Sequence, residues 1–370
     1  MKKMTRLLSL LLCLAVALSM SFAFPQKASA VSTATVKSGS TLKAVEYNSS
    51  GIGTCYLTPA SQATKLYNDF NYNVTVPEKG TIVIQYYANS GSPFISVSGL
   101  GAAFGTNDTA GTDKIKSYTV TSGGTAKLSI SSVDRGATVG FFVYYFPASR
   151  TISANTASYF LGSAGSGAVS TFNVATPSKG WLEVTVVDAF SGNYSTYVMT
   201  SGFNGWEYMS SSRNYSTGIG FKAGTHTIQV KGIASAYRVK TVFHPVKETS
   251  NKTSKKKAAK IKKKKSNKAI VPAGSSKAHW YKIKQPSNKK MTLVVNAGYM
   301  SNGGPSTGKL KVTMYYPNGK HESRTLYPGY KGTYKVYYGR GFTKKAARGT
   351  YYVKIKPSGG ANGYFTLKWK

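Results

Sequence analysis

Residues 72–86 read YNVTVPEKGTIVIQY, and this stretch decides the fold. Apolar or aromatic side chains stand at every second position on both sides of Pro77. That spacing is the period of a β-strand, in which alternate side chains point to opposite faces. Between the two runs, Pro77 fixes its own φ and Gly80 is free to adopt φ > 0. The stretch therefore predicts strand, turn and strand, with the chemistry of an ordinary hairpin.

The same pattern recurs around Pro177 and Pro286. Each proline has an aromatic residue five positions before it, a β-branched residue three before it, and apolar residues five, seven and nine after it. We expect these side chains to face a core. They are Tyr72, Val74, Ile82, Ile84 and Tyr86; Phe172, Val174, Leu182, Val184 and Val186; and Tyr281, Ile283, Met291, Leu293 and Val295.

A second pattern, Gly-Thr, begins at Gly124, Gly224 and Gly349. The residues four and six positions later are again apolar, and we expect them to face inward along a strand. They are Leu128 and Ile130, Ile228 and Val230, and Val353 and Ile355. The interval from proline to glycine is 47 residues in the first two copies and 63 in the third. Any β-rich chain shows alternation, but alternation would not fix the 47-residue interval. The third copy therefore carries an insertion of 16 residues, which we place within Tyr327–Lys345.

Each copy ends in an aromatic strand, at residues 141–146, 237–243 and 364–369. Long helical patterns are missing after the first thirty residues, and the chain contains 27 Tyr and 38 Gly, which suit strands and turns. We predict an all-β protein with three tandem β-sandwich domains of about 100 residues, the size of a two-sheet sandwich. Their expected bounds are residues 31–147, 148–246 and 269–370.

Residues 1–30 have the organisation of a secretory signal peptide. Three cations within the first six residues precede an apolar stretch at residues 7–23, and Ala28-Ser29-Ala30 forms a small-residue cleavage site. An uncleaved membrane anchor is the alternative. Removal of the signal would leave Cys55 as the one cysteine, so we expect no internal disulfide. We expect a secreted, extracellular protein that is associated with the cell envelope.

Four motifs of the third copy resemble a known family. They are residues 280–283 (WYKI), 314–319 (MYYPNG), 349–355 (GTYYVKI) and 363–367 (GYFTL). Together they are similar to the bacterial pre-peptidase C-terminal domain. The resemblance implies a secreted, non-catalytic β-sandwich that is attached to enzymes or surface proteins. Family members often carry acidic residues just before the middle strand. This chain has Lys309 and Lys311 there, so the resemblance implies no acid-dependent calcium site.

Positive charge is concentrated behind residue 246. From Lys247 to the end there are 30 Lys or Arg and two acids, a net charge of +28, whereas residues 31–246 have 15 against nine, a net charge of +6. The run at residues 247–268 shows no apolar periodicity, and its ammonium groups repel one another. We expect an extended, mobile linker there. A solubilising spacer is the alternative, although Gly, Ser or Pro would serve for that.

A basic linker before a basic domain predicts a partner of negative charge. Lysine and arginine would meet phosphate or carboxylate, while tyrosines would stack on sugar or base rings. The candidate polyanion-binding residues are Lys255, Lys256, Lys257, Lys260, Lys262, Lys263, Lys264, Lys265, Lys331, Lys335, Arg340, Lys344, Lys345 and Arg348. The candidate stacking residues are Tyr330, Tyr334, Tyr337 and Tyr338. The same pattern also fits a hairpin whose tyrosines cover a sheet.

Catalytic residues are scarce. Cys55 lacks a cysteine-protease signature. Glycosidases use paired carboxylates, but Asp108 and Asp113 lie in an expected loop, and Glu183 and Asp188 lie at opposite ends of one expected strand. The histidines have no companion at metal-ligand spacing. They are His226, His244, His279 and His321. We expect no enzyme activity, no cofactor, no metal site and no small-molecule substrate.

The sequence predicts a secreted, non-catalytic binding protein of a bacterial surface or extracellular matrix. Its basic linker and third domain would attach to an anionic cell-envelope polymer, an acidic glycan or extracellular DNA, mainly through electrostatic attraction. The alternative is a structural or adhesin-type surface protein whose first two domains contact other proteins. Trp181 and Trp206 also offer aromatic surfaces to neutral glycans.

Overall fold

The computed structural model describes twelve stretches of the chain. They are residues 41–43, 53–59, 70–88, 93–110, 113–131, 139–162, 169–190, 196–234, 236–248, 252–304, 308–336 and 346–370. Within them the chain is built of strands, with one short 3-10 turn, η1 (Ser211–Arg213), and no α-helix. The all-β prediction is confirmed. The signal-peptide prediction concerns residues 1–30, which lie outside the described residues. In the described part, no helix has the length and apolarity to span a bilayer.

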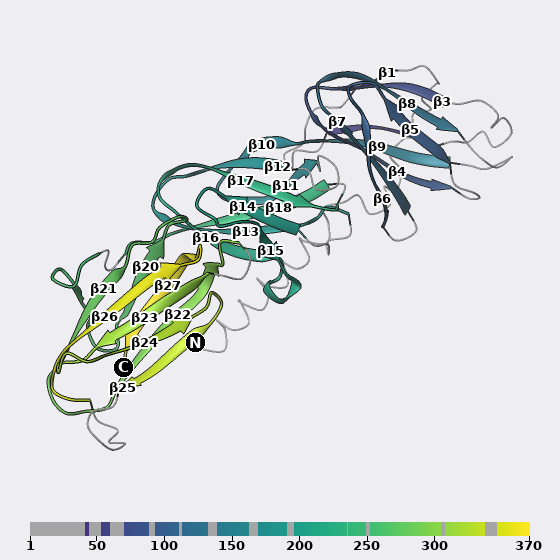
Figure 1. The fold of residues 1–370 in the computed structure, drawn as a ribbon. Coiled ribbons are helices and arrows are strands. Elements are labelled where there is room, and N and C mark those ends of the chain that lie inside the picture. Colours follow the sequence, from purple (N-terminus) through teal and green to yellow (C-terminus); the bar gives the residue numbers. More distant parts are fainter. Residues whose placement is uncertain are drawn as a thin grey trace, which may run out of the picture.

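The described strands form three sets of nine that follow one another along the chain and lie in a row (Figure 1). The first set is β1 (Thr41–Lys43), β2 (Gly53–Pro59), β3 (Phe70–Val76), β4 (Gly80–Ala88), β5 (Phe94–Ser98), β6 (Ala103–Ala110), β7 (Asp113–Val120), β8 (Gly124–Ser131) and β9 (Val139–Pro147). The second is β10 (Ser149–Ile152), β11 (Thr156–Gly162), β12 (Ser170–Thr176), β13 (Gly180–Asp188), β14 (Thr196–Thr200), β15 (Glu207–Met209), β16 (Ser216–Phe221), β17 (Gly224–Gly232) and β18 (Ala236–Pro245). The third is β19 (Ala259–Lys260), β20 (Ser266–Val271), β21 (His279–Gln285), β22 (Met291–Ser301), β23 (Lys309–Tyr315), β24 (His321–Leu326), β25 (Lys331–Val336), β26 (Gly349–Ser358) and β27 (Asn362–Trp369).

Each set forms two sheets. The sheet that contains the first strand has the order β1-β3-β8-β5, β10-β12-β17-β14-β15 or β19-β21-β26-β23-β24. The other has the order β2-β9-β4-β7-β6, β11-β18-β13-β16 or β20-β27-β22-β25. In every set the first strand pairs in parallel with the third. The three sets therefore repeat one arrangement of central strands.

Each set surrounds its own cluster of buried apolar side chains. The fifteen residues of the proline pattern all belong to these clusters, and none is more than 3% exposed. The residues of the Gly-Thr pattern are equally buried. The predicted inward positions are thus confirmed. Burial of each such aliphatic or aromatic side chain stabilises the fold by about 1.5–3 kcal/mol.

The hairpin expected at Pro77 is wrong, because its two strands belong to different sheets. β3 pairs with β8, whereas β4 pairs with β7 and β9. The turn carries the chain from one sheet to the other, so the apolar sides of both strands face each other across the core. β12–β13 and β21–β22 repeat this crossing. A hairpin would have placed both apolar sides on one sheet and left that sheet without a partner layer.

The proline and glycine patterns meet in space, although 47 or 63 residues separate them. In every set the residue before the proline lies opposite the glycine, which begins the partner strand. The pairs are Val76 with Gly124, Thr176 with Gly224, and Gln285 with Gly349. These glycines have φ of 133°, 132° and 145°, a conformation that L side chains rarely adopt. The conserved spacing of the first two copies therefore reflects one strand register.

The extended, mobile linker expected at residues 247–268 is wrong for the part that the structure describes. β19 pairs with β21, and β20 pairs with β27 across the expected domain boundary at Ala269. Ala258 and Ile261 are 4% and 1% exposed, and Ile261 belongs to the third core. Two apolar side chains anchor the run, while the lysines around them remain in solvent. The Lys-rich run therefore supplies the first two strands of the third set.

The place of Ile261 in the core gives the first prediction. Ile261→Ala removes buried methylene groups and should lower the stability of the third set by about 2–5 kcal/mol. Lys263→Ala, an exposed neighbour, should change it by less than about 0.5 kcal/mol. Hydrogen exchange of the β19–β21 amides under mild denaturant measures both changes, because several domains need not unfold in one step. Rapid exchange of the Ile261 amide, which donates to the Lys282 carbonyl at 2.9 Å, would support the linker instead.

Candidate functional site: the lysine face of the third strand set

Lysines gather on the outward side of the sheet β19-β21-β26-β23-β24. We name this surface the lysine face. Its lysines alternate along the strands with the buried residues of the third core. They are Lys260, Lys282, Lys284, Lys309, Lys311, Lys354 and Lys356, and Lys282 and Lys354 are half-buried while the others are exposed.

The strand register brings several of these lysines together. Lys260 lies opposite Lys282, and Lys356 lies opposite Lys311. Residues directly opposite one another in a sheet have their Cβ atoms about 5 Å apart, at which distance like charges repel. The one acid on these strands, Glu322, is already bound, since Arg324 donates to its carboxylate at 2.7 Å and Tyr316 at 2.9 Å. The hydrogen bond from Arg324 also holds the pKa of the Glu322 carboxyl below its ordinary value. The described strands of this sheet therefore supply no acid that could neutralise the lysines.

An aromatic cluster lies among the lysines. The rings of Trp280 and Tyr315 stack at 5.4 Å, and the ammonium of Lys354 lies 5.4 Å from the Trp280 ring. Lys255 lies over the rings of Tyr315 and Tyr352, at 4.9 and 5.1 Å. Cations over aromatic faces are held by the ring quadrupole. These contacts hold Lys255, from the Lys-rich run, on the lysine face.

The other two strand sets provide a matched comparison. Seven outward positions have the same distance from the proline or the glycine in all three sets. In the third set they are Trp280, Lys282, Lys284, Thr350, Tyr352, Lys354 and Lys356. In the first they are Asn71, Asn73, Thr75, Thr125, Lys127, Ser129 and Ser131, and in the second Thr171, Asn173, Ala175, Thr225, Thr227, Gln229 and Lys231. Four lysines in the third set thus replace a single lysine in each of the others.

The opposite sheet of the third set also carries lysines. On β20-β27-β22-β25 the outward positions include Lys268, Lys368, Lys331 and Lys335. Lys268 and Lys331 are separated by Thr366 and Asn296 across the sheet. Both sheets are basic, but the lysine face has more cations and contains the stacked aromatic cluster.

The structure separates the residues that the sequence placed in one site. Lys255 and Lys260 lie on the lysine face. The structure also exposes Lys256, Lys257, the turn Lys262–Lys265, and Arg348 ahead of β26. Lys331 and Lys335 lie on β25, in the opposite sheet. Arg340, Lys344, Lys345, Tyr337 and Tyr338 fall outside the described residues.

Two candidate stacking tyrosines have different environments. Tyr334 is 8% exposed and belongs to the third core, so its assignment as a stacking residue is wrong. Its side chain points inward because β25 pairs with β22, where Tyr334 lies opposite the buried Leu293. Tyr330 is 64% exposed. Both precede the connection between β25 and β26, which has 12 residues where the connection between β7 and β8 has three.

Most lysines of the lysine face were not predicted as site residues from the sequence. Lys282 with Lys284, Lys309 with Lys311, and Lys354 with Lys356 each occupy alternate positions beside core residues. That period-two pattern of lysine would have identified the face if the charges had been assigned to strand sides. The density of charge along the chain pointed to the Lys-rich run at residues 247–268 and not to these strands.

The described part of the chain gathers no set of metal ligands. It contains no group of three His, Cys, Asp or Glu side chains that could hold a metal ion. His279 is buried against Phe365, and burial lowers the pKa of its imidazole. Asp108 and Asp113, expected in a loop, fall in β6 and β7.

No model of a known protein family matches the chain, and no curated protein matches it. Among solved structures, the chain is similar to the pre-peptidase C-terminal domain of a collagenase from Bacillus anthracis, with 11% identity and a TM-score of 0.21. The match covers 25% of this chain and 94% of that one. This similarity is weak and concerns the β-sandwich fold alone.

Tyr334 provides a test of its structural place. Tyr334→Ala should destabilise the third set by about 3 kcal/mol or more, since it removes a buried ring. Tyr334→Phe keeps the ring and should change stability by less than about 1 kcal/mol. Hydrogen exchange of the β22 and β25 amides measures both. A stacking residue would behave differently, because Tyr334→Ala would then weaken polyanion binding without loss of stability.

Proposed function

We propose that this protein is a secreted, non-catalytic binding protein of a bacterial surface or extracellular matrix, and that the lysine face attaches it to an anionic polymer. The candidates are a cell-envelope polymer, an acidic glycan and extracellular DNA. The observation that carries the proposal is the matched comparison. In one repeated fold, four of the seven matched outward positions carry lysine in the third set, against one in each of the other two.

The cost of placing lysines side by side supports a ligand of opposite charge. Lys260 with Lys282 and Lys311 with Lys356 are direct cross-strand neighbours, and such like-charge pairs destabilise a sheet. An extended polyanion would neutralise several of them at once and release its counter-ions. The half-buried rings of Tyr315 and Tyr352 would then add contacts with sugar or base rings.

We further propose that the three strand sets are three β-sandwich domains, of which the third begins at about Lys252 and resembles the pre-peptidase C-terminal domain. The signal peptide at residues 1–30 would bring the chain outside the membrane. Binding there would require neither a cofactor nor a metal.

An adhesin-type role is the second candidate, and one observation favours it. Phe94 and Phe104, in the first set, are 64% and 58% exposed. Large aromatic side chains on an otherwise polar surface are typical of protein contacts. In that case the first set would contact another protein while the third rests on the anionic polymer.

Two pairs of lysines test the polyanion proposal. Lys311→Gln with Lys356→Gln removes two exposed charges from the lysine face, and Lys331→Gln with Lys335→Gln removes two from the opposite sheet. With duplex DNA and isolated wall polymer as probes, the first pair should reduce the log–log salt slope by about one per lysine, and the second by clearly less.

Equal losses for the two pairs would mean that net charge, and not the lysine face, controls binding. Retention of the parent protein on either probe at about 1 M salt, where screening is nearly complete, would contradict electrostatic attachment. Cell adhesion that survives both pairs of substitutions would favour the adhesin-type role.

A further inference from the structure

Two junctions join the three strand sets, and both use the same surface of the repeated fold. In the first set Gly80 pairs with Val120 and Pro147; in the second Gly180 pairs with Phe221 and Pro245. The sheets of the two sets can therefore be aligned residue by residue. Val83 corresponds to Glu183, Ile115 to Ser216, and Phe146 to His244.

The first junction is filled with apolar side chains. Val83, Ile115 and Phe146 are 0% exposed. Phe146 contacts Phe160 at 6.2 Å and Phe190 at 6.1 Å between ring centroids, both from the second set. This junction encloses a small, closely packed core of apolar and aromatic side chains from both sets.

The second junction replaces these apolar residues with polar ones. Glu183, Ser216 and His244 occupy the three equivalent positions, and the Glu183 carboxylate lies 3.3 Å from the His244 ring nitrogen with its side chain 42% exposed. The Trp181 ring stacks between the rings of His244 and of Tyr299, which belongs to the third set. The distances between ring centroids are 3.9 Å to His244 and 5.0 Å to Tyr299. The two sets touch here through β16, β22 and β27, but they do not close the space in front of Glu183.

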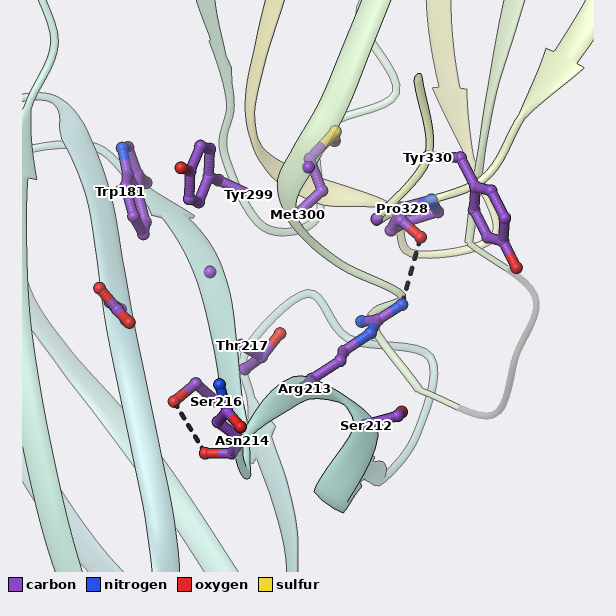
Figure 2. Close-up of a pocket in the computed structure, with 14 residues that line it drawn as sticks. Trp181, Ser212, Arg213, Asn214, Ser216, Thr217, Tyr299, Met300, Pro328 and Tyr330 are labelled. Carbon is purple, nitrogen blue, oxygen red and sulfur yellow. Dashed lines mark hydrogen bonds between the residues drawn. The ribbon is translucent and has the colours of Figure 1, made fainter. Parts of the chain in front are cut away.

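That space is a cleft of about 520 Å³ between the second and third sets. Figure 2 shows Trp181 and Tyr299 on one side, Arg213, Asn214 and Ser216 below, and Tyr330 on the far side. Of the eight large hydrophobic side chains exposed in the described residues, Tyr299 and Tyr330 line this cleft, at 54% and 64% exposure. Exposed tyrosines therefore concentrate at a polar cleft.

The wall that carries Arg213 is held in place by a buried carboxylate. Glu207 is 3% exposed and accepts hydrogen bonds from Thr217 of the second set and from Ser301 and the amide of Gly303 of the third. The guanidinium of Arg213 lies 3.8 Å from Glu207 and donates to the Pro328 carbonyl at 3.2 Å (Figure 2). This bonding spans both sets, so the two walls of the cleft have a fixed separation.

The turn after Arg213 presents further polar groups. Asn214 and Tyr215 both have left-handed backbones, with φ of 50° and 54°. Such conformations cost free energy in residues other than glycine and occur at binding sites more than elsewhere. They place the exposed Asn214 side chain at the mouth of the cleft, beside Ser216 (Figure 2).

We propose that this cleft binds a neutral carbohydrate. Tyrosine rings at Tyr299 and Tyr330 offer apolar faces to a sugar ring while their hydroxyls remain available. The carboxylate of Glu183 accepts hydrogen bonds, the guanidinium of Arg213 donates them, and Asn214 does both, as a ligand rich in hydroxyl groups requires. This site is independent of the lysine face and of the attraction to polyanions.

A peptide is less well suited to the cleft. Extended peptides are recognised through the free edge of a sheet, to which they add a strand. The edge here is β16, and its backbone is engaged by the third set. Asn362 accepts from the Gly220 amide at 3.1 Å, and the Ala273 amide donates to the Gly220 carbonyl at 2.9 Å.

The experiment uses the full-length protein on an array of neutral oligosaccharides, in about 0.5 M salt to screen the lysine face. Titration calorimetry with the best oligosaccharide then compares variants. Glu183→Val with Ser216→Ile makes two of the aligned positions apolar, and Tyr330→Ala removes a rim ring without touching the core. Each should raise the Kd about tenfold or more, equivalent to ~1.4 kcal/mol.

Tyr208→Ala is the matched control, because Tyr208 is 50% exposed but does not line the cleft. It should leave the Kd within about twofold, a few tenths of a kcal/mol. Lys311→Gln with Lys356→Gln should also leave oligosaccharide binding intact, which separates this proposal from the polyanion proposal.

A melting curve verifies that each variant folds. If Glu183→Val with Ser216→Ile does not fold, the Kd of Tyr330→Ala decides the test. The proposal is overturned if no oligosaccharide binds, if the cleft variants bind like the parent, or if a peptide library and not the array finds a ligand at this cleft.

Discussion

The pairing of β21 with β26 determines both faces of the third strand set. Tyr281 lies opposite Val353 in the core, and in the same register Lys282 and Lys354 point outward. Because strand side chains alternate, a slip of one residue would exchange the two groups. It would place several ammonium groups in the core, where an unpaired charge costs far more free energy than an aliphatic side chain gains. The lysines therefore help to specify the register that displays them.

The three strand sets show how one frame acquires different surfaces. Their inward residues are interchangeable aliphatic and aromatic side chains, as in Tyr72, Phe172 and Tyr281. Their outward residues differ in kind, from Asn, Ser and Thr in the first set to Lys and aromatic residues in the third. The fold requires only that outward side chains tolerate solvent, so this surface is free to carry function. The two junctions follow the same logic, since Phe146 closes one and His244 leaves the other polar.

The Lys-rich run shows where reasoning from charge fails. Its lysines repel one another in any conformation, and that repulsion argued for an extended linker. Burial of Ala258 and Ile261, with strand pairing to β21 and β27, folds the run all the same. The lysines remain in solvent, where water and salt reduce their repulsion to a small term. Two apolar side chains and a sheet edge thus outweigh the charges around them.

The sequence by itself determined the strand positions, the buried faces and the basic character of the last third, because a period of two and a repeated interval are local properties. It could not assign the turn at Pro77 to a crossing between sheets, since local spacing is the same in a hairpin. It placed Lys255 and Lys260 among basic residues but could not unite them with Lys311 and Lys356, or separate them from Lys331 and Lys335. Only the tertiary structure decided these points, because strand order brings together residues that are up to a hundred positions apart. The polar cleft between the second and third sets depends on it entirely, since its walls come from two separate sheets.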